Sequence, residues 1–275
     1  MSSRYSGRWT TSSYRYSFWP PMRSVLLLSF GVLALAAGVR ADTPDLTALS
    51  DEFDSAATLS NWQAMQGDVI DGAPTRYAVD SGELVVHTAH SKWFAGERGF
   101  YLWKEVKGDF VATVRLRVSG EHGAVPTADW SLAGLLVRAP PTKTENWLNF
   151  TVGRVRGQSV FERKTTRASS SILVLNAAPT GWIELRQVRI GSRFYLLRRA
   201  AGGGWILHWR YARRDLPATL QVGFDAQSGS GDDHGDLLAR VDYVHYAPTN
   251  VPPRLRQRVL RGHAKLKTIW PYLTR

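Results

Sequence analysis

The sequence predicts an all-β fold, an antiparallel jelly-roll β-sandwich, from three observations. Apolar and polar residues alternate along many short segments, and glycine-containing turns separate these segments at regular spacing. No segment with helical periodicity interrupts the series, which argues against parallel βαβ units. About a dozen short strands at such spacing are typical of a two-sheet sandwich.

The clearest strand is predicted over Asp109–Val118. Alternate residues from Phe110 to Val118 are apolar, and the residues between them include Arg115 and Arg117. A period of two with one polar face is typical of a half-buried antiparallel strand. Further strands are predicted over Glu83–Thr88, Leu132–Arg138, Trp147–Arg156, Ser159–Thr165, Trp182–Ile190, Arg193–Ala200, Trp205–Tyr211, Ala218–Asp225 and Leu237–Tyr246.

Residues 1–41 are predicted to be a cleavable signal peptide, which implies export to the periplasm or outside the cell. The apolar run Val25–Val39 has about 15 residues, fewer than the roughly 20 that span a bilayer as a helix. Arg23 precedes the run, and a small-x-small cleavage pattern precedes Asp42. Met22 offers an alternative start, and an uncleaved membrane anchor is the competing interpretation.

The net charge of +12 belongs to the two ends of the chain. Residues 1–41 and 251–275 together contain 12 of the 35 basic residues and no acidic residue. The 23 basic residues between them balance the 23 acidic ones, so the predicted sandwich is formally neutral. A nucleic-acid-binding fold would carry its basic excess on the folded face, so no nucleic-acid partner is predicted.

The predicted sandwich covers residues 42–247, and residues 248–275 form a linker and a basic C-terminal tail. Apolar residues among the cations, such as Val259 and Ile269, indicate a short basic helix. This helix is either a solvated cap or a means of contact with an anionic surface, such as lipid headgroups or acidic polysaccharide. Without cysteine, the fold depends on its core alone.

Several segments resemble concanavalin-A-like lectins and glucanases. Asp51–Asp54 with Leu59–Trp62 resembles their opening strand, and Val241–Tyr246 resembles the closing strand that pairs beside it. Gly99–Phe110 and Ala133–Arg138 resemble an uncharacterised bacterial and fungal family that includes the "regulation of enolase" protein. The resemblance covers about residues 50–247. It implies a jelly roll with a concave and a convex face and implies little about activity, because one fold hosts many functions.

The sequence favours glycan binding over catalysis. The pattern Glu-x-Asp-x-x-Glu, which places glycosidase acids on one strand of laminarinase-like jelly rolls, is absent, and no other catalytic motif is found. The 11 tryptophans offer apolar ring faces to sugars, and neighbouring polar groups can bond sugar hydroxyls. The alternatives are a glycoside hydrolase or other polysaccharide-active enzyme with a non-standard acid pair, and a structural protein-interaction domain.

The predicted ligand-binding residues are Trp93, Trp103, Arg138, Trp147, Asn149 and Glu162. On a regular strand Trp147 and Asn149 share one face, while Leu148 and Phe150 occupy the other. Because the apolar pair is expected to face the core, Trp147 and Asn149 are predicted to lie outside it as an exposed saccharide subsite.

A structural calcium ion is a further hypothesis, and no cofactor is predicted to be required. The turn Asp232–Asp236 is rich in carboxylate oxygens, which suit Ca²⁺. The alternative interpretation is a solvated acidic loop that binds no metal. The resemblance implies a second location, where first and last strands meet, with Glu52 and Asp242 as ligands.

Overall fold

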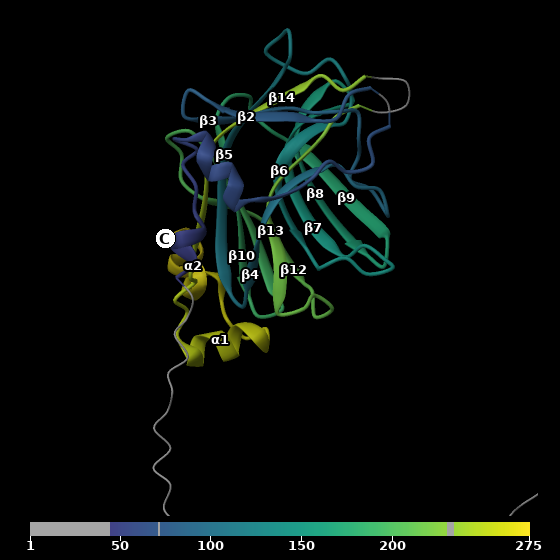
Figure 1. The fold of residues 1–275 in the computed structure, drawn as a ribbon. Helices are drawn as coiled ribbons and strands as arrows, with labels where there is room; N and C mark the ends of the chain where they lie inside the picture. The colour runs from purple at the N-terminus through teal and green to yellow at the C-terminus, as the bar shows by residue number, and fades with distance from the viewer. Residues whose placement is uncertain (1–44, 71, 230–233) are drawn as a thin grey trace, which may run out of the picture. The chain divides into compact units, whose positions relative to one another are not determined.

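The computed structural model describes residues 45–70, 72–229 and 234–275 (Figure 1). The predicted signal peptide therefore lies outside the described residues, as do Asp232 and Asp233. Within the described ranges, no helix combines the length and apolar character needed to cross a membrane.

The described chain forms two seven-stranded antiparallel sheets, which confirms the predicted all-β sandwich. The first sheet has, in spatial order, β1 (Gln63–Met65), β4 (Phe100–Lys107), β13 (Thr219–Gln227), β6 (Ser131–Arg138), β7 (Trp147–Val155), β8 (Gln158–Arg167) and β9 (Ser170–Ala177). The second has β12 (Ile206–Ala212), β11 (Arg193–Ala200), β10 (Ile183–Ile190), β5 (Phe110–Gly120), β14 (Leu237–Ala247), β3 (Glu83–His87) and β2 (Arg76–Asp80).

The hydrophobic core lies between the facing surfaces of the two sheets. Leu135 and Phe150 of the first sheet and Val114 and Leu185 of the second belong to it, and all four are fully buried. Because side chains alternate across a strand, the intervening residues of the first sheet point to its other surface, here called the outer face. The strand alternation read from the sequence thus determines which side chains reach the outer face.

Sequence alternation did not reveal β1, β2, β4 or β9. Strand β9 is an edge strand whose apolar residues run consecutively from Ile172 to Leu175, so it lacks the period of two. Ile172 is 70% exposed. Edge strands have only one neighbour, and their pairing depends on a partner that local periodicity does not identify.

The opening motif differs from the strand implied by the resemblance. It follows the 3₁₀ helix η1 (Leu46–Leu49) and includes part of a second one, η2 (Ala56–Asn61). Its only backbone pairing with β14 among the described residues is one bridge between Asp51 and Val244. Phe53 has a φ of 55°, and its N–H donates to Asp51 Oδ1 at 2.9 Å, so the chain turns here. Strand β14 pairs instead with β5 and β3.

The basic tail is a packed helical hairpin made of α1 (Pro253–Leu260) and α2 (Leu266–Thr274), called the C-terminal hairpin below (Figure 1). Val259, Ile269 and Leu273 are buried in a cluster with side chains of the second sheet that face away from the core. The side chains of the second sheet in this cluster are Val111, Val188, Ile190, Tyr195 and Leu197. The tail is therefore part of the folded domain.

Polar contacts fix the hairpin at two places. Arg256 Nε donates to Asp109 Oδ2 at 2.6 Å, which links α1 to the start of β5. Arg186 Nη1 donates to the carbonyl oxygens of Leu273 and Arg275 at 3.0 and 2.9 Å, and so satisfies the C-terminal end of α2. These contacts explain why a segment with no acidic residue still docks in one position.

Candidate ligand-binding site on the first sheet

The structure brings the six predicted ligand-binding residues together on the outer face. Arg138 lies opposite Trp147 in the β6–β7 register, and Glu162 lies opposite Thr151 in the β7–β8 register. Trp103 projects from β4, and Trp93 reaches the same face from the β3–β4 connection, residues 88–99. The grouping that alternation predicts for Trp147 and Asn149 is therefore correct.

The predicted exposure of Trp147 and Asn149 is wrong. Trp93, Trp147 and Glu162 are fully buried, Asn149 is 1% exposed and Arg138 is 2% exposed. Only Trp103 is partly accessible. The outer face is covered because the 88–99 loop folds over it, and nothing in the alternation of β7 records a loop that begins 60 residues earlier.

The 88–99 loop is anchored to the outer face through the backbone of Trp93. The Trp93 N–H donates to Gln227 Oε1 at 2.7 Å, and Lys164 Nζ donates to the Trp93 carbonyl at 2.6 Å. Gly99 leaves room for the indole, since a Cβ there would lie 2.7 Å from Trp93 Cδ1. The loop is therefore held from strands β13 and β8, on either side of the centre of the sheet.

Aromatic contacts fill the space under the loop. The Trp93 and Trp147 rings meet edge to face at 5.8 Å, and the Trp93 and Tyr101 rings do so at 5.9 Å. Trp103 stacks on Tyr101 at 5.1 Å with an interplanar angle of 18°. Such pairs add to the stabilisation from burial of the rings. Three of the predicted sugar platforms therefore pack against a second aromatic ring in this arrangement.

Beneath the aromatic cluster runs a row of polar side chains that spans four strands. Asp225 of β13 is in register with Gly134 of β6, which is in register with Thr151 of β7, and Thr151 is in register with Glu162 of β8. Gly134 contributes no side chain to the row, and a Cβ there would lie 2.3 Å from the Phe150 carbonyl oxygen. Sequence reasoning missed Asp225 because the partners of β13 were not known.

Burial dominates the electrostatics of this row. It raises the pKa of Asp225 to about 8, although Asn149 Nδ2 donates to Asp225 Oδ2 at 2.5 Å. Burial also raises the pKa of Glu162, opposed by the Lys164 ammonium 2.8 Å away. Asp225 Oδ1, Thr151 Oγ1 and Asn149 Oδ1 find no hydrogen-bond partner in the described part of the chain. The raised pKa favours the protonated, uncharged form of Asp225 at pH 7.

The two acids lie on strands that are not neighbours in the first sheet. Three strand spacings separate Asp225 from Glu162, about 14 Å between their backbones. Retaining and inverting glycosidases hold their carboxyl groups about 5–5.5 Å and about 6.5–9.5 Å apart. Both acids are also fully buried, so a sugar cannot reach them while the 88–99 loop is in place.

The guanidinium of Arg138 is already bonded to neighbouring side chains of the protein. Its guanidinium donates to both carboxylate oxygens of Glu145, at 2.8 and 2.6 Å, and to Gln221 Oε1 at 3.0 Å. Such a two-pronged pair fixes the β6–β7 connection and leaves little capacity for a sugar hydroxyl.

An open pocket remains at the edge of the loop and is here called the aromatic pocket. It has a volume of about 220 Å³ and is lined by Lys92, Trp93, Phe94, Glu97, Trp130, Lys164, Leu173, Gln227 and Gly229. Phe94 is 43% exposed at the tip of the loop, and Trp130 is half-buried. Lys92 and Glu97 form an ion pair at 2.8 Å on the rim. Phe94 was not predicted from the sequence, because its position depends on how the loop folds.

Each proposed calcium ligand already pairs with a basic side chain. Glu52 Oε1 lies 2.5 Å from His245 Nε2, and Asp242 pairs with Arg115. Among the described residues, no group of three or more acidic or histidine side chains is arranged to hold a metal ion. These residues do not fit a calcium site as they stand, and calcium stays a prediction. A fall in melting temperature on adding a chelator would be the mark of such an ion.

Comparisons with known proteins define the class of fold. A functionally unknown protein from Saccharomyces cerevisiae superposes with a TM-score of 0.55 at 16% identity, covering 69% of this chain and 97% of that one. The GH43 protein BlXynB from Bacillus licheniformis gives 0.56 at 17% identity, covering 72% of this chain and 39% of that one. A putative beta-glucanase from Mycobacterium abscessus gives 0.50 at 15% identity, with 72% and 98% covered.

This chain therefore has a glycoside-hydrolase-like sandwich fold. It spans about two fifths of the length of the GH43 proteins that it resembles. No family model matches the sequence, and no curated protein matches it. At these identities the similarity defines the fold, and function has to be argued from the site.

Proposed function

We propose that this protein is an exported, lectin-like carbohydrate-binding domain without catalytic activity, related to the family that includes the "regulation of enolase" protein. The observation that carries the proposal is the aromatic pocket, where exposed Phe94 and half-buried Trp130 lie beside the Lys92–Glu97 pair. Aromatic faces with adjacent charged hydrogen-bonding groups suit a saccharide ring. The folds of a GH43 protein and a putative beta-glucanase make this ligand class a reasonable choice.

The covered outer face supports a non-catalytic role. An enzyme needs acids that touch its substrate, and both acids of the polar row are fully buried. The aromatic pocket contains one carboxylate, Glu97, already paired with Lys92. The chemistry available at the accessible surface is therefore that of binding.

Phe94→Ala is expected to weaken glycan binding by about 1–3 kcal/mol, by analogy with base stacking on aromatic side chains. The measurement is a glycan array, followed by titration calorimetry with the best neutral oligosaccharide. Trp209→Ala is the matched control, because Trp209 is 44% exposed on edge strand β12, away from the pocket. Equal losses in both variants, or no binding by the wild type, would contradict the proposal.

A glycoside hydrolase is the second candidate, favoured by the shared register of Asp225 and Glu162. It requires the 88–99 loop to open. Hydrolysis of xylan or β-glucan that disappears in both Asp225→Asn and Glu162→Gln, with folding intact, would support the enzyme over the binding domain.

Export is tested separately by intact-mass analysis of secreted material, which is expected to show an N-terminus at Asp42. A mature chain that retains Val25–Val39 would contradict the predicted cleavage.

A further inference from the structure

We propose that the surface formed by the C-terminal hairpin and strands β11 and β12 binds acidic polysaccharide, with a pocket between two arginines receiving a carboxylate of the chain. The inference extends the proposed function, because it names a class of glycan and a second surface. It uses residues remote from the aromatic pocket, so the two sites can be tested independently.

The two-arginine pocket lies where the hairpin meets the second sheet. It has a volume of about 300 Å³ and is lined by Arg193, Tyr195, Arg210, Tyr211, Ala212, Val259, Gly262 and Ala264. Arg210 is opposite Tyr195 in the β11–β12 register, and Arg193 and Tyr195 are two residues apart on β11. Both arginines therefore flank the same tyrosine on one face of the sheet.

These two arginines have no carboxylate partner among the residues that the structure describes, and the pocket has no acidic lining residue. Neighbouring arginines differ, since Arg256 pairs with Asp109 and Arg213 with Asp215. The positive charges of Arg193 and Arg210 both act on the Tyr195 hydroxyl, opposing the rise in its pKa that burial causes. Two unpaired guanidinium groups around one hydroxyl form a site that an anion would complete.

The shape of the pocket is set by the end of α1. Gly262 has a φ of 78°, its N–H donates to the Val259 carbonyl at 3.0 Å, and the His263 N–H donates to the Arg258 carbonyl at 2.8 Å. This is the glycine-dependent helix ending known as the Schellman motif. A Cβ at Gly262 would lie 3.4 Å from Arg193 Nη2, so glycine also leaves room for the guanidinium.

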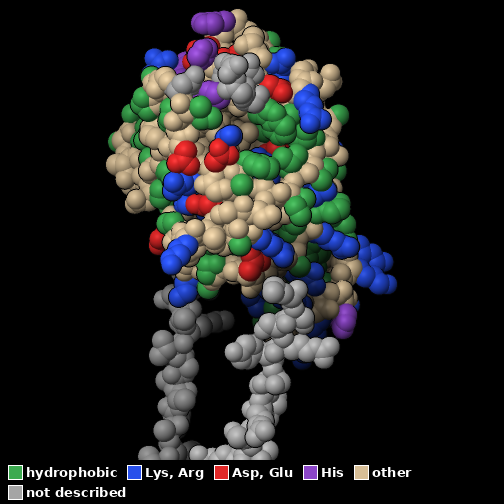
Figure 2. All heavy atoms as spheres, turned by 90° about the vertical axis from the view of Figure 1, so that its right-hand side faces the viewer, with side chains coloured by type: hydrophobic (Ala, Val, Ile, Leu, Met, Phe, Trp, Pro, Cys, Tyr) green, Lys and Arg blue, Asp and Glu red, His purple; other side chains and the backbone are tan. Residues whose placement is uncertain are grey.

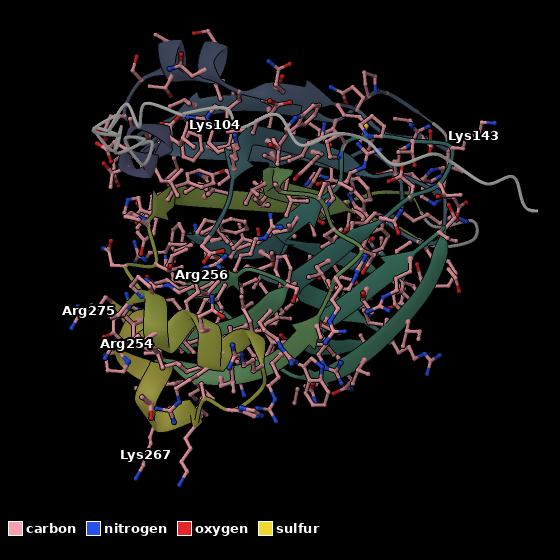
Figure 3. All side chains as sticks on the ribbon, turned by 90° about the horizontal axis from the view of Figure 1, so that it is seen from below. Lys104, Lys143, Arg254, Arg256, Lys267 and Arg275 are labelled. Carbon is pink, nitrogen blue, oxygen red and sulfur yellow. The ribbon has the colours of Figure 1, made fainter. Side chains whose placement is uncertain are left out.

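The surface around the pocket carries a single sign of charge. Residues 248–275 contain no acid, and the following cations are exposed: Arg254, Arg258, Arg261, Lys265, Lys267 and Arg275. Figure 3 shows Arg254, Lys267 and Arg275 along the outer side of the hairpin, whereas Arg256 lies on the side of the sheets. Basic side chains also gather toward the lower edge in Figure 2, the end at which Figure 1 places the helices.

Acidic polysaccharide fits this surface better than a lipid bilayer does. A helix that lies in a membrane buries an apolar face in the lipid. Here the apolar faces of both helices are already packed on the second sheet, and Leu266 is the one large apolar side chain of the hairpin that is well exposed, at 38%. The pocket instead combines a tyrosine ring with two guanidinium groups, which suits a uronic acid residue.

The test compares three ligands on the intact secreted protein: polygalacturonate, its methyl-esterified counterpart, and vesicles that contain phosphatidylglycerol. Polygalacturonate is expected to bind, and its binding should weaken as the salt concentration rises. The methyl ester is expected not to bind. Arg193→Gln and Arg210→Gln are each expected to weaken binding at least tenfold. Arg76→Gln, an exposed arginine on β2 at the opposite edge of the same sheet, is the control and should have no effect.

Each other outcome overturns the inference. An equal loss with Arg76→Gln would mean non-specific charge attraction, and binding to vesicles but not to polygalacturonate would assign the surface to lipid. Binding of neutral glycans through Phe94 without binding of polygalacturonate would overturn this inference alone, whereas binding of neither would overturn the proposed function as well. If a glutamine variant lowers the melting temperature, Arg210→Lys keeps the charge without the planar fork and should still weaken binding.

Discussion

Trp147→Ala is expected to destabilise the protein by about 3–5 kcal/mol, the usual cost of removing a fully buried tryptophan. Its indole is fully buried and packs edge to face on Trp93, with the Lys164 ammonium 5.9 Å from the ring. Removal leaves a cavity beside polar atoms that already lack partners, such as Asn149 Oδ1. Urea denaturation followed by tryptophan fluorescence and circular dichroism would measure the change.

Trp209→Ala serves as the control, because an exposed tryptophan on an edge strand should cost less than about 1 kcal/mol when it is truncated. A similarly small effect for Trp147→Ala, together with weaker glycan binding, would mean that the 88–99 loop leaves the outer face in solution. That result would restore the exposed saccharide subsite on β7.

Asp225→Asn is expected to stabilise the protein above neutral pH by an amount on the order of 5 kcal/mol. The pKa of Asp225 is about 8 in the folded protein, against an ordinary value of 3.8. Each unit of difference corresponds to about 1.4 kcal/mol. The side-chain oxygen of an asparagine can still accept from Asn149, and an uncharged residue avoids the cost of ionisation in the buried row.

The sign of the pH dependence follows from proton binding. Between about pH 4 and pH 8, the folded protein retains a proton on Asp225 that the unfolded chain has lost, so stability falls as pH rises. Wild-type stability should therefore decline across this range, and Asp225→Asn should remove most of the decline while changing little at pH 4. Melting curves at pH 4, 6 and 8 test this.

The control for this experiment is Asp80→Asn, which removes an exposed carboxylate of β2. It should leave the pH dependence unchanged. A flat wild-type profile would mean that water reaches Asp225 in the folded protein.

These two experiments concern one structural feature, the closure of the outer face by the 88–99 loop. Closure covers the surface on which the sugar-binding tryptophans were predicted. It leaves the aromatic pocket accessible at the edge of the loop. If the loop opens, Asp225 would be an accessible proton donor in the same row as Glu162, and that result would favour the enzymatic alternative. The proposed binding role and its rival therefore differ in the state of a single loop.

The sequence by itself determined ten of the fourteen strands and the direction of most side chains on them. Arg193–Ala200 was predicted with the bounds of β11, and the alternation along β7 correctly placed Trp147 and Asn149 on the face opposite Phe150. The reason is that a strand has a side-chain period of two, which is a local property that amphipathic segments record directly.

Only the tertiary structure decided what each face meets. Asp225 and Glu162 are 63 residues apart and share a row because β6 and β7 lie between their strands. Trp93 buries Trp147 because a loop between two other strands crosses the sheet. The basic tail packs on the second sheet, which leaves Arg193 and Arg210 at its margin. Strand pairing and loop placement depend on contacts between distant segments, and local periodicity contains no information about those contacts.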